Sequence, residues 1–512
     1  MHGLQITYET LGATRNEASI DVLISALDDE NANTRRSALA ALLSRSERRA
    51  PELVLANWDK LQTDDLRVLR PKRKWLLLTI ADALECGGSQ TEIAITAAEA
   101  LQMTEVLPQL VLRAESSASR SIKKRTTDVV LELVEPLGLR AREDRDQATV
   151  RGPARTRLAD SANRFSMHRN ERLIDAFLVV SSWGDAELRQ ALSDQSQAID
   201  LICKRMEESD HPSVVDLLAG FIRRRNVHPK VVKLMFTRQD DAFRDALLRK
   251  ISAEPSATVL RNLREMGLPN CLKGGEPLLD DLTADLRAAA SHAYAAAGDD
   301  LMESLHVIVG AVARGGEGVD SAAALGLSRC DVPDIDFWMR AAVPVADGDE
   351  ERIKADPNAH LLHRLIHLLN HTDAAVEKSV RRVLEPLNAE HMLERFESLR
   401  PRSRRRLGRV VMMVDPEAVQ RVRDSLRHPV LGQRLKAIAM ADALAAVDLL
   451  SDAFEHISTE DHQEARVRAA EVMGDANGEV TLGLLQRMTD LPDCPVKDAA
   501  LSALNKREKV KR

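Results

Sequence analysis

The chain has 512 residues, of which 44% are hydrophobic and 3% aromatic, and its formal net charge is −7. This acidic balance excludes a protein that binds nucleic acid through overall positive charge. The five cysteines form no C-x-x-C pair, which argues against a zinc ribbon or a disulfide framework and indicates a reducing compartment.

The first clear pair of helices is predicted at residues 16–27 and 31–46. Ile20, Leu23, Ile24 and Leu27 have the spacing of one buried helical face, and polar residues follow them at the turn. The inner helices of the first repeats start more than 40 residues apart, so the repeats of residues 1–139 are expected to be long and irregular. Further helices are predicted at 51–61, 73–85, 91–103, 105–114 and 119–137.

Two segments interrupt the helical pattern. Residues 140–170 are rich in Arg and Asp, contain Gly152-Pro153 and show little apolar periodicity, so we expect an irregular linker there. Helical repeats are predicted to resume over 171–266. Residues 267–349 hold ten of the 23 glycines, although 280–297 and 300–314 still have helical patterns. This second segment is predicted to be either a degenerate pair of repeats or a hinge.

The most regular repeats are predicted over 350–512. A pattern of an apolar residue, a basic residue and two later small residues starts at positions 376, 404, 435, 465 and 496, a period of about 30 residues. A helical hairpin of this size cannot bury its apolar face alone, so neighbouring hairpins must stack. Small residues within the pattern let helices of adjacent repeats approach closely.

This pattern resembles the second helix of the HEAT repeat family, with a Val-Arg-x-x-Ala-x-x-Ala-Leu-like signature. The match is good at 34–42, 465–474 and 496–504, and looser where Asp442 takes a small-residue position. The resemblance implies an all-α, HEAT-like α-α superhelix, a solenoid of antiparallel helical hairpins in the wider armadillo-like helical class. It implies little about activity, because a fold does not fix a function.

A basic residue recurs at the second motif position. The resemblance implies that it pairs with a turn acid of an adjacent repeat, and Asp28, Asp241, Asp373, Asp461 and Asp493 occupy such turns. We therefore interpret the recurring cations as structural rather than as a phosphate-binding surface. They are Arg35, Lys123, Arg244, Arg405, Lys436, Arg466 and Lys497.

Denser basic clusters occur at 67–74, 120–125, 223–225, 400–409 and 506–512. Most of this charge is interpreted as solvated surface, because the clusters need not share a face and aromatic side chains that could stack on bases are sparse. Two clusters nevertheless supply the candidate partner-binding residues. These are Arg402, Arg404, Arg406 and Arg409, and Arg223, Arg224 and Arg225.

Four histidines, at 360, 363, 367 and 371, are predicted to share the exposed face of one helix. His363 and His367 are four residues apart, which is a spacing that can chelate a metal ion, so they are the candidate metal ligands. No H-E-x-x-H arrangement accompanies them, and a polar outer face is the preferred interpretation.

No catalytic motif is found. The chain has no His-Glu dipeptide, which the HEAT-like deoxyhypusine hydroxylases use to bind iron, and no P-loop or nucleophile-elbow motif. We therefore predict a non-enzymatic scaffold or adaptor without a cofactor, which binds a macromolecular partner, a protein, along the solenoid surface. The alternatives are a nucleic-acid-binding solenoid that uses the basic clusters and, third, a HEAT-like lyase or other enzyme.

No secretory signal or membrane-spanning run is visible, so a soluble cytoplasmic protein is expected. The excess of Arg over Lys is typical of a GC-rich bacterial genome.

Overall fold

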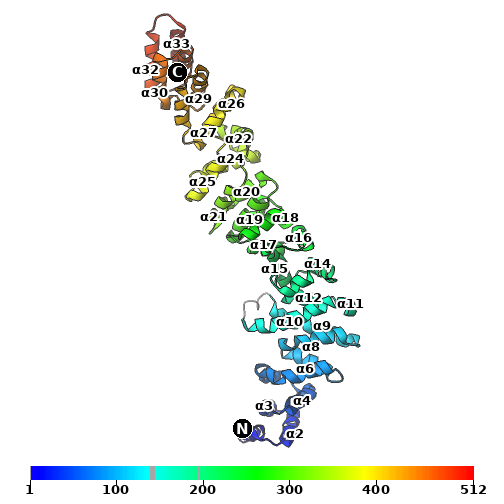
Figure 1. The fold of residues 1–512 in the computed structure, drawn as a ribbon. Helices are drawn as coiled ribbons and strands as arrows, with labels where there is room; N and C mark the ends of the chain where they lie inside the picture. Colours follow the sequence, from blue (N-terminus) through cyan, green and yellow to red (C-terminus); the bar gives the residue numbers. More distant parts are fainter. Residues whose placement is uncertain (1, 139–144, 194–195, 512) are drawn as a thin grey trace. The chain divides into compact units, whose positions relative to one another are not determined.

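The computed structural model describes residues 2–138, 145–193 and 196–511, and these residues form α-helices and short 3-10 turns without any strand. The predicted all-α class is therefore confirmed. Figure 1 shows successive helices packed as hairpins. The chain divides into two compact units, residues 1–250 with 269–271 and residues 251–268 with 272–512. Across the described residues, no helix is both long and apolar enough to cross a membrane.

The first unit stacks its helices in two rows. In one row α7, α9, α12 and α15 contact one another in order, and in the other α6, α8, α10 and α13 do so. The helices are α1 (His2–Ala13), α2 (Ala18–Ser25), α3 (Ala32–Leu43), α4 (Arg49–Ala56), α5 (Thr63–Leu69), α6 (Leu77–Cys86), α7 (Thr91–Ala100), α8 (Leu107–Ser116), α9 (Arg120–Val134), α10 (Arg145–Asn163), α11 (Phe165–His168), α12 (Arg172–Val180), α13 (Ala186–Ala191), α14 (Ile199–Glu208), α15 (Pro212–Gly220), α16 (Pro229–Thr237) and α17 (Asp241–Ile251).

The second unit has the same construction. Its most regular part is the row formed by α27, α29, α31 and α33, which we call the inner row, with α26, α28, α30 and α32 beside it. The helices are α18 (Ala257–Met266), α19 (Ala284–Ala297), α20 (Leu301–Arg314), α21 (Val319–Arg329), α22 (Ile335–Asp347), α23 (Glu350–Ala355), α24 (Pro357–Leu368), α25 (Ala374–Val383), α26 (Ala389–Arg395), α27 (Pro401–Val414), α28 (Ala418–Leu426), α29 (Leu431–Ala443), α30 (Ser451–Glu460), α31 (Gln463–Met473), α32 (Glu479–Thr489) and α33 (Pro495–Lys511).

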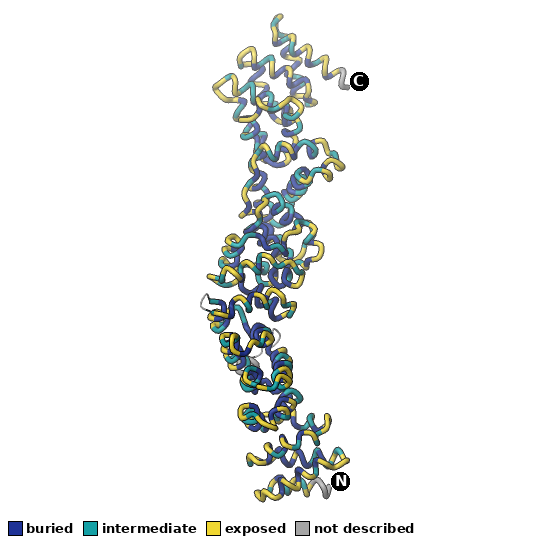
Figure 2. Tube along the Cα trace, turned by 90° about the vertical axis from the view of Figure 1, so that its right-hand side faces the viewer, coloured by how far each residue is buried: buried dark blue, intermediate teal, exposed yellow. Residues whose placement is uncertain are grey.

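Apolar and small side chains form the core between the rows. Buried residues follow the helix faces that meet their neighbours, whereas exposed residues occupy turns and outer faces (Figure 2). Gly408 shows why the repeat needs small residues. A Cβ atom at this position would lie 2.1 Å from the carbonyl oxygen of Ala443, so only glycine allows α27 to approach the end of α29 this closely.

The recurring cations make contacts within the chain, but the predicted pairing with a turn acid of an adjacent repeat holds only in part. Lys123 and Arg466 donate to backbone carbonyl oxygens, and Arg244 and Lys497 pair with acids three or four residues away. Arg35 and Arg434 are the fourth residues of α3 and α29 and make equivalent contacts. The Nη1 atom of Arg35 donates to the carbonyl oxygens of residues 29 and 30, at 2.8 and 3.0 Å, and that of Arg434 donates to those of residues 428 and 429, at the same two distances. Arg434, and not Lys436, therefore occupies this place in α29.

Each of these arginines also contacts the next repeat. Arg35 binds Asp65 at 3.1 Å and Gln62 at 2.6 Å, and Arg434 binds Asp461 at 2.6 Å. Arg404 is likewise the fourth residue of α27, but it is Arg405, the predicted residue, that pairs with acids of the following repeats, Asp442 and Asp475. One guanidinium thus joins the turn before its own helix to the turn of the following repeat, because its planar fork can donate in several directions.

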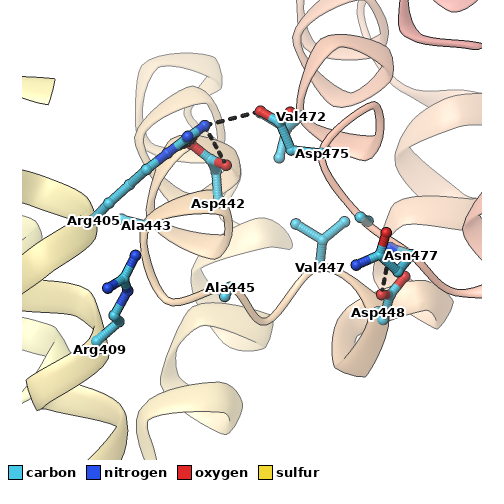
Figure 3. Close-up of a pocket in the computed structure, with 11 residues that line it drawn as sticks. Arg405, Arg409, Asp442, Ala443, Ala445, Val447, Asp448, Val472, Asp475 and Asn477 are labelled. Atoms are coloured by element: carbon cyan, nitrogen blue, oxygen red, sulfur yellow. Dashed lines mark hydrogen bonds and ion pairs between the residues drawn. The ribbon is translucent and has the colours of Figure 1, made fainter. Parts of the chain in front are cut away.

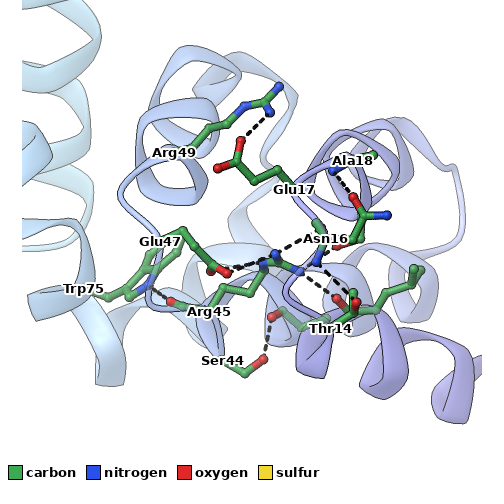
Figure 4. A network of polar contacts seen from close by, with 12 residues as sticks. Thr14, Asn16, Glu17, Ala18, Ser44, Arg45, Glu47, Arg49 and Trp75 are labelled. Carbon is green, nitrogen blue, oxygen red and sulfur yellow. Dashed lines mark hydrogen bonds and ion pairs between the residues drawn. The ribbon is translucent and has the colours of Figure 1, made fainter.

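Arginines in other positions cap helix ends across repeats. Figure 4 shows Arg45, which donates from Nη1 to the carbonyl oxygen of Leu11 at 2.9 Å and from Nη2 to that of Asn16 at 3.2 Å. Arg113, Arg238 and Arg507 similarly donate to Leu84, Met206 and Met473, which lie 29 to 34 residues earlier in the last turns of α6, α14 and α31. The last carbonyls of a helix lack intrahelical donors and attract cations, so these arginines stabilise the turns.

The prediction of an irregular linker at 140–170 is wrong for most of that range, because α10 covers Arg145–Asn163. Residues 139–144 lie outside the described part of the chain. The helix buries Ala154, Leu158 and Ala162, a stripe at i, i+4 and i+8. Arg157 of α10 and Arg164, the residue directly after it, pair with Glu115 of α8 at 2.7 and 3.1 Å. The charged residues therefore join α10 to its neighbours instead of marking a loop.

The glycine-rich segment 267–349 is also largely helical. The predicted helices at 280–297 and 300–314 are confirmed as α19 and α20, and α19 packs on α21, which packs on α25. Most of its glycines lie outside the helices, but Gly310 and Gly326 are buried within α20 and α21. Between α20 and α21, Gly315, Gly316 and Gly318 have φ values of 64°, 125° and 77°, a conformation that L side chains rarely adopt. The segment thus belongs to the stacked rows of the second unit.

Candidate functional site

A pocket of about 260 Å³ opens on the inner row of the second unit (Figure 3). Its walls come from α27, from the end of α29 with the turn after it, and from the end of α31. The floor is apolar and consists of small residues, while charged side chains form the rim. The floor residues are Ala443, Ala445, Val447, Val472 and Ala476.

Arg405 joins two acids on the rim. Its Nη2 atom lies 3.2 Å from Oδ1 of Asp442 and 2.9 Å from Oδ2 of Asp475, and Asp475 also pairs with Lys506 of α33 at 2.5 Å. The Asp442 carboxylate raises the pKa of Arg405. Burial acts to raise the pKa of Asp475, but Lys506 and Arg405 outweigh it and lower that pKa overall. Arg405 and Asp475 therefore both remain charged near neutral pH.

Asp448 and Arg507 fix the far wall. The Asp448 carboxylate accepts hydrogen bonds from the backbone N–H groups of Asn477 and Gly478, both at 3.0 Å, and from the Thr481 hydroxyl at 2.7 Å. Arg507 donates to the same hydroxyl at 2.8 Å. A Cβ atom at position 478 would lie 2.5 Å from Oδ1 of Asp448, so the turn needs glycine there.

Arg409 is the cation of this pocket that is least engaged within the chain. It is exposed, lies one turn after Arg405 on α27, and donates from Nη1 to the carbonyl oxygen of Ala346 at 3.1 Å. Figure 3 shows its guanidinium directed toward the pocket beside Ala443 and Ala445. Because a guanidinium has five N–H donors, Arg409 can still donate to a carboxylate or carbonyl group that enters the pocket.

The other candidate arginines of α27 lie on different sides of the helix. Arg404 stacks 4.3 Å above the Phe396 ring and donates to the carbonyl oxygen of Leu399 at 2.9 Å, and Arg406 pairs with Asp347 at 2.8 Å. Arg402 is exposed in the first turn. Of the four arginines predicted here as partner-binding residues, the structure places Arg409 alone at the pocket.

The second candidate cluster lies in the first unit. Arg223 donates from Nε to the carbonyl oxygen of Lys250 at 2.8 Å, which is again a contact with a helix end. Arg224 and Arg225 line a wider depression of about 640 Å³ together with Arg189. Burial, and then repulsion from Arg189, lowers the pKa of Arg224. Arg223 therefore contacts a helix end, whereas Arg224 and Arg225 line the depression.

His363 and His367 come together on α24, as their spacing predicts. Their Nε2 atoms are 3.2 Å apart, and the two rings meet edge to face at 79°. Burial, followed by the neighbouring His367 and His360, lowers the pKa of His363. Within the part of the chain that the structure describes, no group of three or more His, Cys, Asp or Glu side chains is arranged to hold a metal ion.

The pocket on the inner row was not predicted as a site. The sequence did contain one signal, since Asp442 interrupts the small-residue pattern at a position where other repeats have Ala or Val. Its partner Asp475 lies 33 residues later, close to one repeat length. The two acids occupy different places in their repeats, Asp442 within α29 and Asp475 just after α31, so the repeat pattern does not align them.

Comparisons with known proteins give the following result. The sequence matches no family model, and no curated protein matches it significantly. Among solved structures, one similar chain comes from a study of a phosphorylation switch that controls the interaction between cadherin and beta-catenin. Its sequence identity is 12%, the match covers 98% of each chain, and the TM-score is 0.21.

Proposed function

We propose that the protein is a non-enzymatic scaffold or adaptor that binds another protein along the surface of its helical repeats. The contact is centred on what we call the inner strip, formed by Arg405, Arg409, Asp442, Asp475 and Lys506. The observation that carries the proposal is the origin of these residues. They come from α27, α29, α33 and the end of α31, so four stacked repeats present one surface.

The composition of the inner strip supports a protein partner. Charges of both signs surround a small apolar floor, which is the arrangement of a polar rim around an apolar centre in protein interfaces. The pocket of about 260 Å³ is also smaller than the ~300–1,000 Å³ usual for small-molecule sites. A single side chain from a partner is a better occupant, with Arg409 as its hydrogen-bond donor.

The alternative of a nucleic-acid-binding solenoid is less well supported. Phosphate binding needs lysines and arginines that are available to the backbone of the nucleic acid. Arg223 and Arg404 instead donate to carbonyl oxygens within the chain, and Arg406 is paired with Asp347. The acids of the inner strip would also repel phosphates.

The test is affinity purification of the tagged full chain from its native cells, with and without nuclease. We expect a stoichiometric protein partner that survives nuclease treatment. Arg409→Glu should abolish recovery of this partner, because it reverses the charge at the pocket. The matched control is Arg487→Glu, which changes an exposed arginine of α32 that pairs with Glu455 away from the inner strip.

Two results would overturn the proposal. One is that only nucleic acid, or proteins released by nuclease, copurifies with the chain. The other is that both variants retain the partner equally, which would place the contact elsewhere.

A further inference from the structure

We propose that His363 and His367 form a two-histidine site for a first-row transition-metal ion such as Zn²⁺ on α24. This inference is independent of the proposed scaffold function, because neither residue belongs to the inner strip.

The geometry carries the proposal. The two residues are one helical turn apart and therefore share a face of α24. Zinc binds imidazole nitrogen at ≈ 2.0–2.1 Å. The two Nε2 atoms are 3.2 Å apart. A metal ion bound to both at that bond length would have an N–metal–N angle of about 100°. This angle lies between the octahedral and the tetrahedral value, so an ion can bind both nitrogens with little movement of the rings.

The chemical state of the rings also suits a metal ion. A hydrogen bond between the two Nε2 atoms needs one protonated and one unprotonated nitrogen. When both rings carry their proton on Nδ1, both Nε2 lone pairs point to the same region and can be shared by a cation.

One acidic residue lies near the pair. Glu350, the first residue of α23, interacts electrostatically with His363, and α23 packs against α24. His367 is exposed, so water or a side chain from another molecule can complete the coordination. Two protein ligands with open positions differ from the closed four-ligand arrangement of structural zinc sites.

The test is calorimetric titration of the full chain with Zn²⁺ alone in metal-free buffer at pH 7.5. We expect one site whose affinity falls at least tenfold in His363→Ala and in His367→Gln. The control is His456→Ala, a variant of an exposed histidine on α30 that lies beside Glu460, and it should bind as the wild type does.

Hydrogen exchange gives a second readout. Zn²⁺ should slow amide exchange in α24 of the wild type and not in the two site variants. The reason is that an ion bound by two side chains one helical turn apart restrains that turn of the helix. The proposal is overturned if the wild type binds no Zn²⁺, or if either site variant binds it as tightly as the wild type.

Discussion

The buried ion pair between Arg35 and Asp65 allows the structural role of the recurring arginine to be measured. The side chains are 3% and 0% exposed, and Arg35 also binds Gln62 and two backbone carbonyls. Truncation of Arg35 to Ala would leave the Asp65 carboxyl group buried without its cation. Its remaining partner would be the backbone N–H of Gln62, which donates to it at 3.0 Å. Breaking one side of a buried pair costs ~3–5 kcal/mol.

Arg36 provides a matched control on the same helix. It pairs with Asp64 at 3.2 Å, but these side chains are 40% and 50% exposed. Exposed pairs contribute ~0–1 kcal/mol. Arg35→Ala should therefore destabilise the first repeats strongly, while Arg36→Ala should have little effect.

Hydrogen exchange is the suitable assay, because stacked repeats need not unfold in one step. A loss of ~3–5 kcal/mol corresponds to faster exchange by about two to four orders of magnitude in residues 32–69. The double variant Arg35→Met/Asp65→Leu should recover most of the protection, because an apolar pair needs no charge compensation. Equal effects of Arg35→Ala and Arg36→Ala would refute this reasoning.

Three further predictions concern packing, capping and protonation. Gly408→Ala should destabilise the packing of α27 on α29 by ~1–3 kcal/mol, because its Cβ would meet the carbonyl of Ala443. Gly432→Ala, whose Cβ would have nothing within 4 Å, should not; amide exchange in α27 and α29 compares the two variants, and equal rates would contradict the reasoning. Asp448→Ala should destabilise the turn after α31 by ~1–3 kcal/mol, because it leaves the N–H groups of Asn477 and Gly478 unpaired. Amide exchange at residues 476–481 should become faster, and unchanged rates would contradict this. Burial lowers the pKa of His292 in the folded chain, so the unfolded chain takes up the proton at a higher pH. The stability of the folded chain should therefore fall as the pH drops below ~6.5. Amide exchange in α19 should depend less on pH in His292→Gln than in the wild type, and equal pH dependence in both would contradict this.

The regular helices could be predicted because their apolar spacing follows directly from stacking. α19 and α20 were found in this way despite the glycines around them. α10 was missed because its buried stripe consists mainly of alanines between arginines, and alanine is a weak signal in a charged segment. The ion pairs that make those arginines structural depend on Glu115, which lies more than 40 residues earlier.

The register of the recurring cation could not be obtained from the motif. Arg434 and Lys436 are both basic and two residues apart, and only the positions of the carbonyl groups at residues 428 and 429 distinguish them. The inner strip was missed for a related reason. Arg405, Asp442 and Asp475 come together through the stacking of three repeats, and the sequence shows each of them only within its own helix.

Cross-linking with mass spectrometry on the native complex, after nuclease treatment, tests the central claim most directly. If the inner strip binds a protein, cross-links from Lys506 should reach one partner in constant proportion, and Arg409→Glu should remove them. Exposed lysines on other helices, such as Lys204 and Lys354, should give few cross-links to that partner. Partner cross-links concentrated at those lysines and absent from Lys506 would contradict the account.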